Sequence, residues 1–295
     1  MKNSTSLLEK NLVELIRRTS TSLPNDVETA LRKAAAKEKK NSLARETLDT
    51  ILKNVRLARR QSAPLCQDTG TLTFFCRVPS NFDINALRAA IRNAVSTATI
   101  EGYLRQNAVD SVTGTTYPTN IAHGSPLIHC EQGAIKSVDI RLLMKGGGCE
   151  NVSRQYALPD NGMGAGRDLA GVRHCILDAV QRAQGNGCAP GVLGVCIGGD
   201  REGAYAMAKE QFLRKITDSS RVQQLAALER RILKDAAELG VGPMGMGGAN
   251  TLIGVKIAAL SRIPASFFVT VSYMCWALRR RGVLLSLNGG VRRWL

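Results

Sequence analysis

A short polar segment, Pro64-Leu65-Cys66-Gln67-Asp68-Thr69-Gly70, carries the residue types that most directly suggest chemistry. It places a thiol, an amide, a carboxylate and a hydroxyl side by side, just before an apolar run at residues 71–78. A thiolate beside a carboxylate could serve as a metal ligand next to an acid–base group. The segment could also be a helix-to-strand loop that Asp68 caps, and these residues alone support the two interpretations about equally.

Two more cysteines lie at turns or strand ends far along the chain. Cys188 lies between Gly187 and the pair Ala189-Pro190, and Cys275 follows a predicted strand at residues 266–272. Turns and strand ends are places where side chains from distant parts of a sequence can converge on one ligand. These positions therefore allow a convergent site, without showing which side chains take part.

The chain has eight cysteines, at positions 66, 76, 130, 149, 175, 188, 196 and 275. In a cytosolic chain of 295 residues this count favours metal or cluster ligation plus buried thiols over a disulfide framework. There is no Cys-x-x-Cys pair, so neither a zinc finger nor a local cluster motif is supported. Any cluster would have to be assembled from distant cysteines.

The net charge of the chain is +16. This charge is consistent with a basic surface of no special role, with attraction of anions such as dicarboxylates, or with docking onto an acidic subunit. A basic nucleic-acid-binding protein is an alternative of another class, but nucleic acid is not expected as a partner, because no known binding motif is present and only 4% of residues are aromatic. No apolar run approaches the roughly 18 residues of a membrane helix, and the first ten residues do not resemble a secretory signal. We therefore expect a soluble cytoplasmic protein.

The apolar periodicity predicts an α+β fold, with an N-terminal helical region followed by mixed α/β lobes. Residues 1–60 are expected to be helical, and residues 110–126 a long loop rich in Thr, Gly and Pro. Strands are predicted at 71–78, 137–144, 191–197, 252–259 and 266–272, and helices at 84–100, 169–184, 204–213 and 223–239. We expect a single domain over residues 1–295.

The glycines gather in three clusters, at residues 146–148, 185–199 and 240–248. Glycine lets the backbone approach a ligand closely, although ordinary tight turns account for most glycines. Three clusters beside polar residues favour a site. None of them matches a nucleotide-binding motif, so a nucleotide site is not expected.

Five segments taken together resemble the alpha-subunit region of class I fumarate hydratases and L(+)-tartrate dehydratases. They are Cys66-Gln-Asp-Thr-Gly70, Lys145-Gly-Gly-Gly-Cys-Glu-Asn151, Gly187-Cys-Ala-Pro190, Gly242-Pro-Met-Gly-Met-Gly-Gly-Ala-Asn250 and Cys275-Trp276. Each segment is modestly specific, but all five in this order are highly specific. The resemblance spans nearly the whole chain and implies a fold built around an iron–sulfur site.

The resemblance implies a [4Fe–4S] cofactor. In that family three cysteines hold the cluster and the fourth iron stays open, and by motif these cysteines are Cys66, Cys188 and Cys275. An iron with an open position acts as a Lewis acid on a hydroxyl group that must leave. The other five cysteines have no ligand role in the resemblance, although Cys149 could line the site.

The same resemblance implies the residues that handle the substrate. Gln67 and Asp68 would contact the substrate or its hydroxyl, with Asp68 as a proton donor. Arg105 would pair with a substrate carboxylate, although a plain surface arginine is the commoner fate of this residue type. Backbone N–H groups of Gly147 and Gly148 would bind the same anion. Lys145 and Asn151 would orient that loop.

The chain departs from the family pattern at one position before the third cysteine. The family usually has a histidine there, in an Arg-His-Pro segment, whereas this chain has Arg262-Ile263-Pro264. If that histidine touches the substrate, affinity or specificity differs here. The departure also favours an alternative of another class, a non-catalytic iron–sulfur protein that senses iron or oxygen.

The C-terminal end carries a second departure. Single-chain relatives continue into a second domain with the proposed catalytic base, whereas this chain ends at Leu295. We therefore expect a separate beta subunit and an αβ hetero-oligomer such as α2β2. The basic stretch Arg279-Arg280-Arg281 and Trp294 are candidate docking residues, with a frayed tail as the alternative.

The resemblance predicts a hydro-lyase that dehydrates (S)-malate to fumarate reversibly. L(+)-tartrate dehydratase is the close alternative, and a mesaconate-type substrate is a further one. The first two substrates differ by one hydroxyl group, and no pocket residue that distinguishes them is evident from the sequence.

Overall fold

The computed structural model describes the backbone of residues 2–295 and the side chains from Leu7 onward. About 42% of the residues are helical and 23% are in strands of mixed sheets, which confirms the predicted α+β fold. The chain forms two compact units. The first comprises Met1–Pro24, Asn54–Gly146 and Arg279–Leu295, and the second comprises Asn25–Lys53 and Gly147–Leu278.

The first unit contains a five-stranded sheet with the strand order β2-β1-β3-β8-β9. The strands are β1 (Thr71–Pro79), β2 (Leu127–Gly133), β3 (Val138–Lys145), β8 (Arg279–Leu285) and β9 (Val291–Trp294). β1 and β2 run parallel, and the other neighbours run antiparallel. β2 is therefore an edge strand, hydrogen-bonded only to β1.

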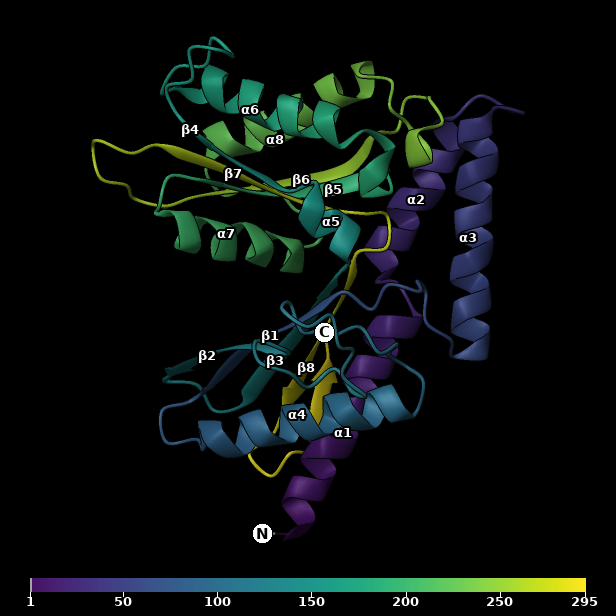
Figure 1. Ribbon diagram of the computed structural model, residues 1–295, viewed down its shortest axis with the longest axis vertical. Helices are drawn as coiled ribbons and strands as arrows, with labels where there is room; N and C mark the ends of the chain where they lie inside the picture. The colour runs from purple at the N-terminus through teal and green to yellow at the C-terminus, as the bar shows by residue number, and fades with distance from the viewer. Residues whose placement is uncertain (1) are drawn as a thin grey trace. The chain divides into compact units, whose positions relative to one another are not determined.

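Helices α1 (Lys2–Thr21) and α4 (Ile84–Ile100) pack against this sheet and share one core with it (Figure 1). α4 buries Leu87, Ala90, Ile91, Ala94, Val95 and Ala98, which recur at the helical period and form an apolar stripe. Asp83 starts the helix because its carboxylate accepts the N–H of Ala86 at 2.9 Å. The predicted helix at 84–100 is confirmed at both ends.

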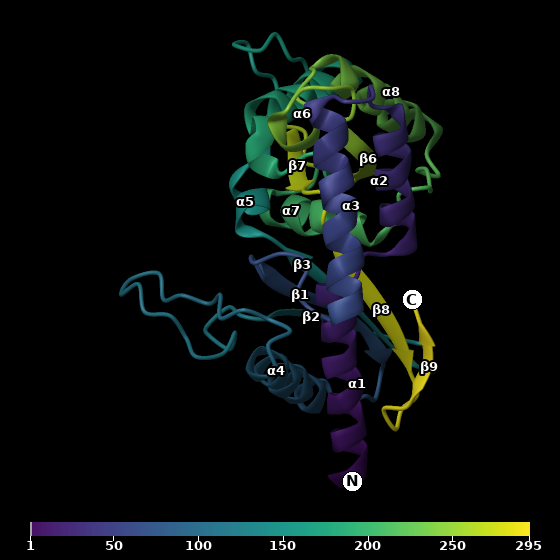
Figure 2. The same ribbon diagram turned by 90° about the vertical axis from the view of Figure 1, so that its right-hand side faces the viewer.

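Residues 101–126 connect α4 to β2 without a helix or a strand. Figure 2 shows this connection extending away from the sheet of the first unit as a long irregular loop. Asp110 organises its tip, because its carboxylate accepts the N–H groups of Val112 and Thr113 at 3.0 and 2.7 Å. The long loop predicted at 110–126 is confirmed.

The second unit contains a four-stranded sheet with the order β4-β7-β5-β6. Its strands are β4 (Arg154–Ala157), β5 (Gly191–Ile197), β6 (Leu252–Ala259) and β7 (Phe268–Met274). Helices α6 (Leu169–Ala183) and α8 (Gln223–Glu238) cover one face and α7 (Arg201–Glu210) covers the other (Figure 1). Since both faces are covered, every residue of β5 is buried.

Two longer and several short helices complete the chain. They are α2 (Asn25–Lys37), α3 (Leu43–Gln61), α5 (Gly147–Asn151), and the 3₁₀ turns η1 (Gln184–Gly187), η2 (Gln211–Leu213) and η3 (Pro243–Gly245). One of the places where the chain passes from one unit to the other falls within α3. Glu38, just after α2, accepts N–H groups from Ala249 and Asn250 and the Asn250 amide at 3.1, 3.0 and 2.6 Å. This carboxylate anchors the end of the 242–250 segment within the second unit.

The basic C-terminal stretch is part of the sheet, so the frayed-tail interpretation is wrong. Arg279 begins β8 and is 1% exposed. Arg281 donates to the hydroxyl of Ser22 and the carbonyl of Leu23 at 3.0 and 2.9 Å. The Trp294 ring lies 4.1 Å from the Arg18 guanidinium. Among the described helices, none is both long enough and apolar enough to cross a membrane.

Candidate functional site

Cys188 and Cys275 meet at one end of the sheet in the second unit. Cys188 precedes β5 and Cys275 follows β7, and these strands are antiparallel neighbours with Val192 opposite Met274. In such a pair, the start of one strand and the end of the other lie at the same edge of the sheet. The Trp276 N–H donates to the Cys188 carbonyl at 3.2 Å and ties the two segments together. The topology thus brings together two of the three predicted cluster ligands.

Cys149 is a third thiol at this edge. Its sulfur accepts the backbone N–H of Cys275 at 3.3 Å. Its carbonyl accepts the hydroxyl of Ser153 at 2.8 Å, and that hydroxyl accepts the N–H of Tyr273 at 3.1 Å. These bonds fasten α5 to the end of β7. Cys149 therefore lies beside Cys275, and its place in the site stays a prediction.

The Tyr273 side chain lies behind these thiols and is 1% exposed. A Cβ added at Gly187 would lie 2.4 Å from the Tyr273 ring, so the glycine leaves the space that the ring occupies. Burial raises the pKa of Tyr273, and negative charge on Cys149, Cys275 and Cys188 acts in the same direction. The tyrosine therefore remains neutral at physiological pH. The sequence does not predict that Tyr273 packs behind the thiols, because Tyr273 is one more residue of an apolar strand.

The backbone at Cys188 adopts a conformation that is uncommon for a residue with a side chain. Its φ is +51°, in the left-handed region, and its N–H donates to the Gly185 carbonyl at 3.0 Å. Such conformations cost roughly 1–3 kcal/mol and gather at functional sites. Next to it, the Ala189 carbonyl accepts the Met244 N–H at 2.8 Å. The segments 187–190 and 242–250, both part of the resemblance, are thereby in contact.

Gly148 and Asn151 line a hollow of about 450 Å³ in the second unit. Arg154, Arg182 and Asn186 complete much of its wall. A hollow of this size is within the range that small ligands occupy. Arg182 is held by Asp178 at 2.8 Å. Gly148, one of the two predicted substrate-binding glycines, therefore lies at a concave, basic surface.

In the first unit, Thr69 joins the Cys66-Gln67-Asp68 segment to Arg105. The Thr69 hydroxyl accepts the Arg105 N–H at 2.8 Å and donates to the Arg105 carbonyl at 3.2 Å. The Asn120 amide donates to the same carbonyl at 2.9 Å. The Arg105 side chain is exposed and forms no hydrogen bond or ion pair with any described residue. The predicted carboxylate-binding arginine is thus fixed at its backbone, with an accessible guanidinium.

The Cys66 segment is anchored at both ends. The Leu65 N–H donates to the Ser20 carbonyl at 2.9 Å, and the Asp68 N–H donates to the Cys66 sulfur at 3.4 Å. At the other end Gly70 has a φ of +72°, and a Cβ there would lie 2.2 Å from the Lys145 carbonyl oxygen. Only glycine permits this approach. Within the first unit, the Cys66–Gly70 segment therefore lies against Lys145, the first residue of the second segment.

The predicted ligands are divided between the two units, with Cys66 in the first and Cys188 and Cys275 in the second. Throughout the described part of the chain, no three His, Cys, Asp or Glu side chains form a group that could hold a metal ion. All eight cysteines are thiols rather than disulfides, which is the donor chemistry that an iron–sulfur cluster requires. The set of three ligands stays a prediction.

Ile263, at the usual histidine position, lies in the connection between β6 and β7 and is 67% exposed. Cys275 follows the other end of β7. Seven residues of strand separate the two ends, which corresponds to about 23 Å. Within the second unit, Ile263 therefore does not contact Cys188 or Cys275.

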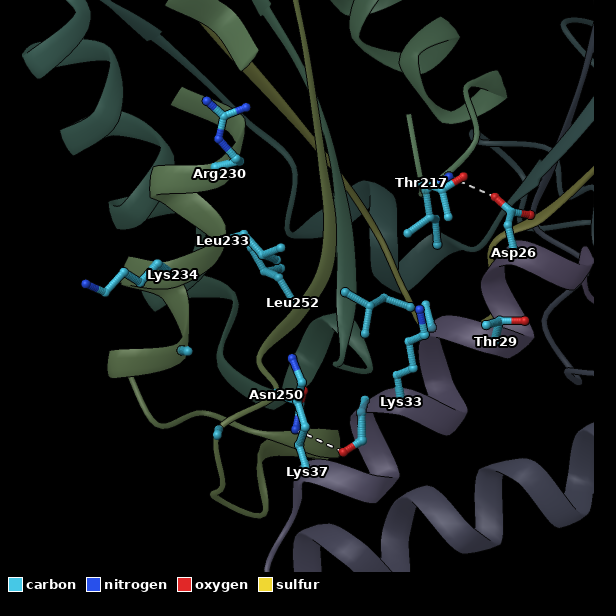
Figure 3. Close-up of a pocket in the computed structure, with 16 residues that line it drawn as sticks. Asp26, Thr29, Lys33, Lys37, Thr217, Arg230, Leu233, Lys234, Asn250 and Leu252 are labelled. Atoms are coloured by element: carbon cyan, nitrogen blue, oxygen red, sulfur yellow. Dashed lines mark hydrogen bonds between the residues drawn. The ribbon is translucent and has the colours of Figure 1, made fainter. Parts of the chain in front are cut away.

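A second hollow, of about 530 Å³, lies between α2, α8 and β6 and contains none of the predicted site residues (Figure 3). Lys33 and Lys37 stand on the α2 side, and Arg230 and Lys234 on the α8 side. No described residue forms an ion pair with these four cations. Asp26, at one end, is occupied in accepting the Ile216 N–H at 2.8 Å.

Known proteins resemble this chain over most of its length. The family model described as Fumarate hydratase (Fumerase) matches residues 9–283. A Geobacillus stearothermophilus protein named for fumarate hydratase class I is 46% identical over 292 residues, which are 98% of this chain. Those residues are 57% of the relative, so the chain spans little more than half of that protein.

Two further relatives carry names that refer to the alpha subunit of L(+)-tartrate dehydratase. The Methanocaldococcus jannaschii protein is 34% identical over 91% of this chain and 94% of its own length. The Escherichia coli K12 protein is 31% identical over 90% of this chain and 86% of its own length. The chain thus spans most of the length of both relatives.

Proposed function

This chain belongs to the fumarate hydratase (Fumerase) family, and on that premise we propose that it is the alpha part of a hydro-lyase that interconverts (S)-malate and fumarate. The proposal rests most on the meeting of Cys188 and Cys275 at one sheet edge, in a chain that the family model matches over residues 9–283. The 46% identity with the Geobacillus protein supports fumarate as the product.

L(+)-tartrate is the second candidate substrate. Its support is the similarity to two proteins named for the alpha subunit of tartrate dehydratase, which are 34% and 31% identical to this chain. The same correspondence supports a separate beta subunit as partner, which would supply the base that removes the carbon-bound proton.

The thiols of Cys66, Cys188 and Cys275 would hold a [4Fe–4S] cluster in this proposal. The donor set fits such a group, since two of these thiols already meet at one edge. When bound, the cluster supplies an iron with an open position, which polarises the hydroxyl group that leaves.

The residues of the chain would bind and orient the substrate. The accessible Arg105 guanidinium would pair with one substrate carboxylate, because two parallel N–H···O bonds fit that group. Gln67 would hydrogen-bond the hydroxyl, and the Asp68 carboxyl would hold the proton that the departing oxygen takes up to leave as water. The N–H groups of Gly147 and Gly148 would bind the same substrate carboxylate as Arg105.

Iron and acid-labile sulfide per chain test the ligand assignment, on protein reconstituted without oxygen. We expect about four irons in the unaltered chain and a loss in each of Cys66→Ser, Cys188→Ser and Cys275→Ser. Cys175→Ser is the matched control, because Cys175 is fully buried in the second unit and lies outside the five segments. An iron content that is unchanged in all three variants would overturn the assignment.

Turnover with the partner subunit tests the substrate. We expect a higher kcat/KM for (S)-malate than for L(+)-tartrate, and the reverse order would establish tartrate instead. An iron-loaded complex that turns over neither substrate would favour the non-catalytic alternative.

A further inference from the structure

Cys76 and Cys130 lie directly opposite each other on neighbouring strands of the first unit. The register of β1 and β2 pairs Cys76 with Cys130, and Arg77 with Glu131 one residue further on. The Arg77 and Glu131 side chains form an ion pair at 3.4 Å, which supports this register. Paired residues share a face of the sheet. The two thiols therefore face the same core.

The two thiols differ in exposure and in chemistry. Cys76 is buried, whereas Cys130 is half-buried on the edge strand. The Cys76 thiol donates a hydrogen bond to Cys130, and together with the Arg88 guanidinium on α4 this lowers the pKa of Cys130 to about 7. The pKa of Cys76 is raised, mostly by its hydrogen bond to Cys130 and to a smaller extent by burial and by the charge of Asp139. The pair thus joins a half-buried thiol whose pKa is lowered to a buried thiol whose pKa is raised.

We propose that Cys130 and Cys76 are a modification site, a dithiol that hydroperoxides oxidise to a disulfide between β2 and β1. Neighbouring strands lie about 4.8 Å apart, within the roughly 4.4–6.8 Å between Cα atoms that a disulfide spans. β2 is bonded on one side only, so it can adjust to the sulfur–sulfur bond. Neither residue belongs to the proposed cluster ligands.

The chemistry requires only hydrogen peroxide as oxidant. The Cys130 thiolate attacks one peroxide oxygen, the oxygen–oxygen bond breaks, and hydroxide leaves, which makes Cys130 a sulfenic acid. The Cys76 sulfur then attacks the Cys130 sulfur, the sulfur–oxygen bond breaks, and water leaves with the Cys76 proton. Two thiols have lost two electrons and two protons, and one peroxide has become two waters.

Mass spectrometry of peroxide-treated full-length protein tests the proposal. Chymotryptic cleavage after Phe75 separates Cys66 from Cys76, so a peptide linked to Cys130 can be assigned to one cysteine. We expect a Cys76–Cys130 linked pair that dithiothreitol removes. In Cys76→Ser protein we expect a sulfenic acid at Cys130 that dimedone traps, and in Cys130→Ser no linked pair.

The rates at which the thiols of the untreated protein are labelled give a second test. Near neutral pH we expect iodoacetamide to label Cys130 at least about tenfold faster than Cys196, whose pKa burial raises to about 12. Arg88→Gln is expected to slow Cys130 labelling, whereas Arg92→Gln, an exposed arginine on the same helix, is the matched control. Equal labelling of Cys130 and Cys196, or no linked pair after peroxide, would overturn the proposal. The readout depends on neither iron nor turnover, so it is independent of the proposed function.

Discussion

Thr69 and Asn120 show what individual residues add to the candidate site without touching a ligand. Both bind the backbone of Arg105, a residue that is distant in sequence from Thr69. Thr69 is 3% exposed and adjoins Asp68, so one hydroxyl connects the predicted proton donor to the predicted carboxylate-binding arginine. The family resemblance predicted roles for Asp68 and Arg105 but none for Asn120, because a single amide in a Thr- and Pro-rich loop is common.

Replacing Thr69 tests this positioning role. Thr69→Ala removes two hydrogen bonds to Arg105, each worth about 1 kcal/mol, so we expect KM for the dicarboxylate to rise roughly fivefold to thirtyfold. The kcat of the complete enzyme should change much less, because the hydroxyl contacts no reacting atom. Steady-state kinetics with the partner subunit measure both constants.

Thr69→Ser is the matched control for this prediction. It keeps the hydroxyl and should restore KM to within about twofold of the original value. A serine variant as impaired as the alanine variant would contradict a hydrogen-bonding role and indicate a packing defect instead.

At the scale of elements, apolar periodicity predicted those strands and helices whose burial follows a regular period. The strands at 191–197 and 252–259 and the helix at 84–100 agree with the structure at both ends. The predicted strand at 266–272 lies two residues too early, because β7 extends to Met274. That difference matters for the site, because it places Cys275 immediately after the strand.

The sequence did not predict the elements whose formation depends more on pairing with neighbouring elements than on the local pattern of apolar residues. β8 begins with three arginines, which reads as a solvated basic run, yet the strand pairs with both β3 and β9. β2 has the sequence LIHCEQG and lies at a sheet edge with little periodic burial. α5 has only five residues, fewer than a periodicity argument needs. The meeting of Cys188 and Cys275 was equally inaccessible, because it depends on which strands pair.

The start of α7 carries a prediction about stability. The Asp200 carboxylate accepts the Gly203 N–H at 2.6 Å, and α7 buries Ala204 and Ala208 against the sheet of the second unit. We expect Asp200→Ala to lower the free energy of unfolding by about 1 kcal/mol, because one terminal N–H loses its acceptor. Urea unfolding followed by circular dichroism measures the change.

Asp200→Asn is the control for the cap, since asparagine is as good an N-cap as aspartate. It should retain most of the stability. If the asparagine and alanine variants lose the same free energy, the charge of Asp200 matters and the cap does not.

For the whole molecule, the dominant electrostatic fact is the net charge of +16. Cations such as Lys33, Lys37, Arg230 and Lys234 have no acidic partner among the described residues and contribute to self-repulsion. The ion pairs of the two units therefore matter more than their surface positions suggest, because each carboxylate also reduces this repulsion.

Acid should destabilise the protein through carboxylates in both units. In the first unit, the hydrogen bond from Arg17 at 2.7 Å lowers the pKa of Glu14 against the effect of burial, and Arg18 at 2.6 Å assists. In the second unit, burial raises the pKa of Asp235, but Arg173 and Arg231 outweigh it and the net shift is downward.

The sign of this pH dependence follows from the downward direction of both shifts. Each lowered pKa contributes stability that is fully present above the unfolded-state values of 4.5 for Glu14 and 3.8 for Asp235, and is lost as the pH falls through the lower folded-state values. Unfolding midpoints in urea should therefore be flat from neutral pH to about pH 5 and fall steeply below it. Glu14→Gln should lower the neutral-pH midpoint and reduce the steepness of the acid limb, because glutamine cannot titrate. A Glu14→Gln protein with an unchanged acid limb would show that the Glu14 ion pairs do not govern acid unfolding.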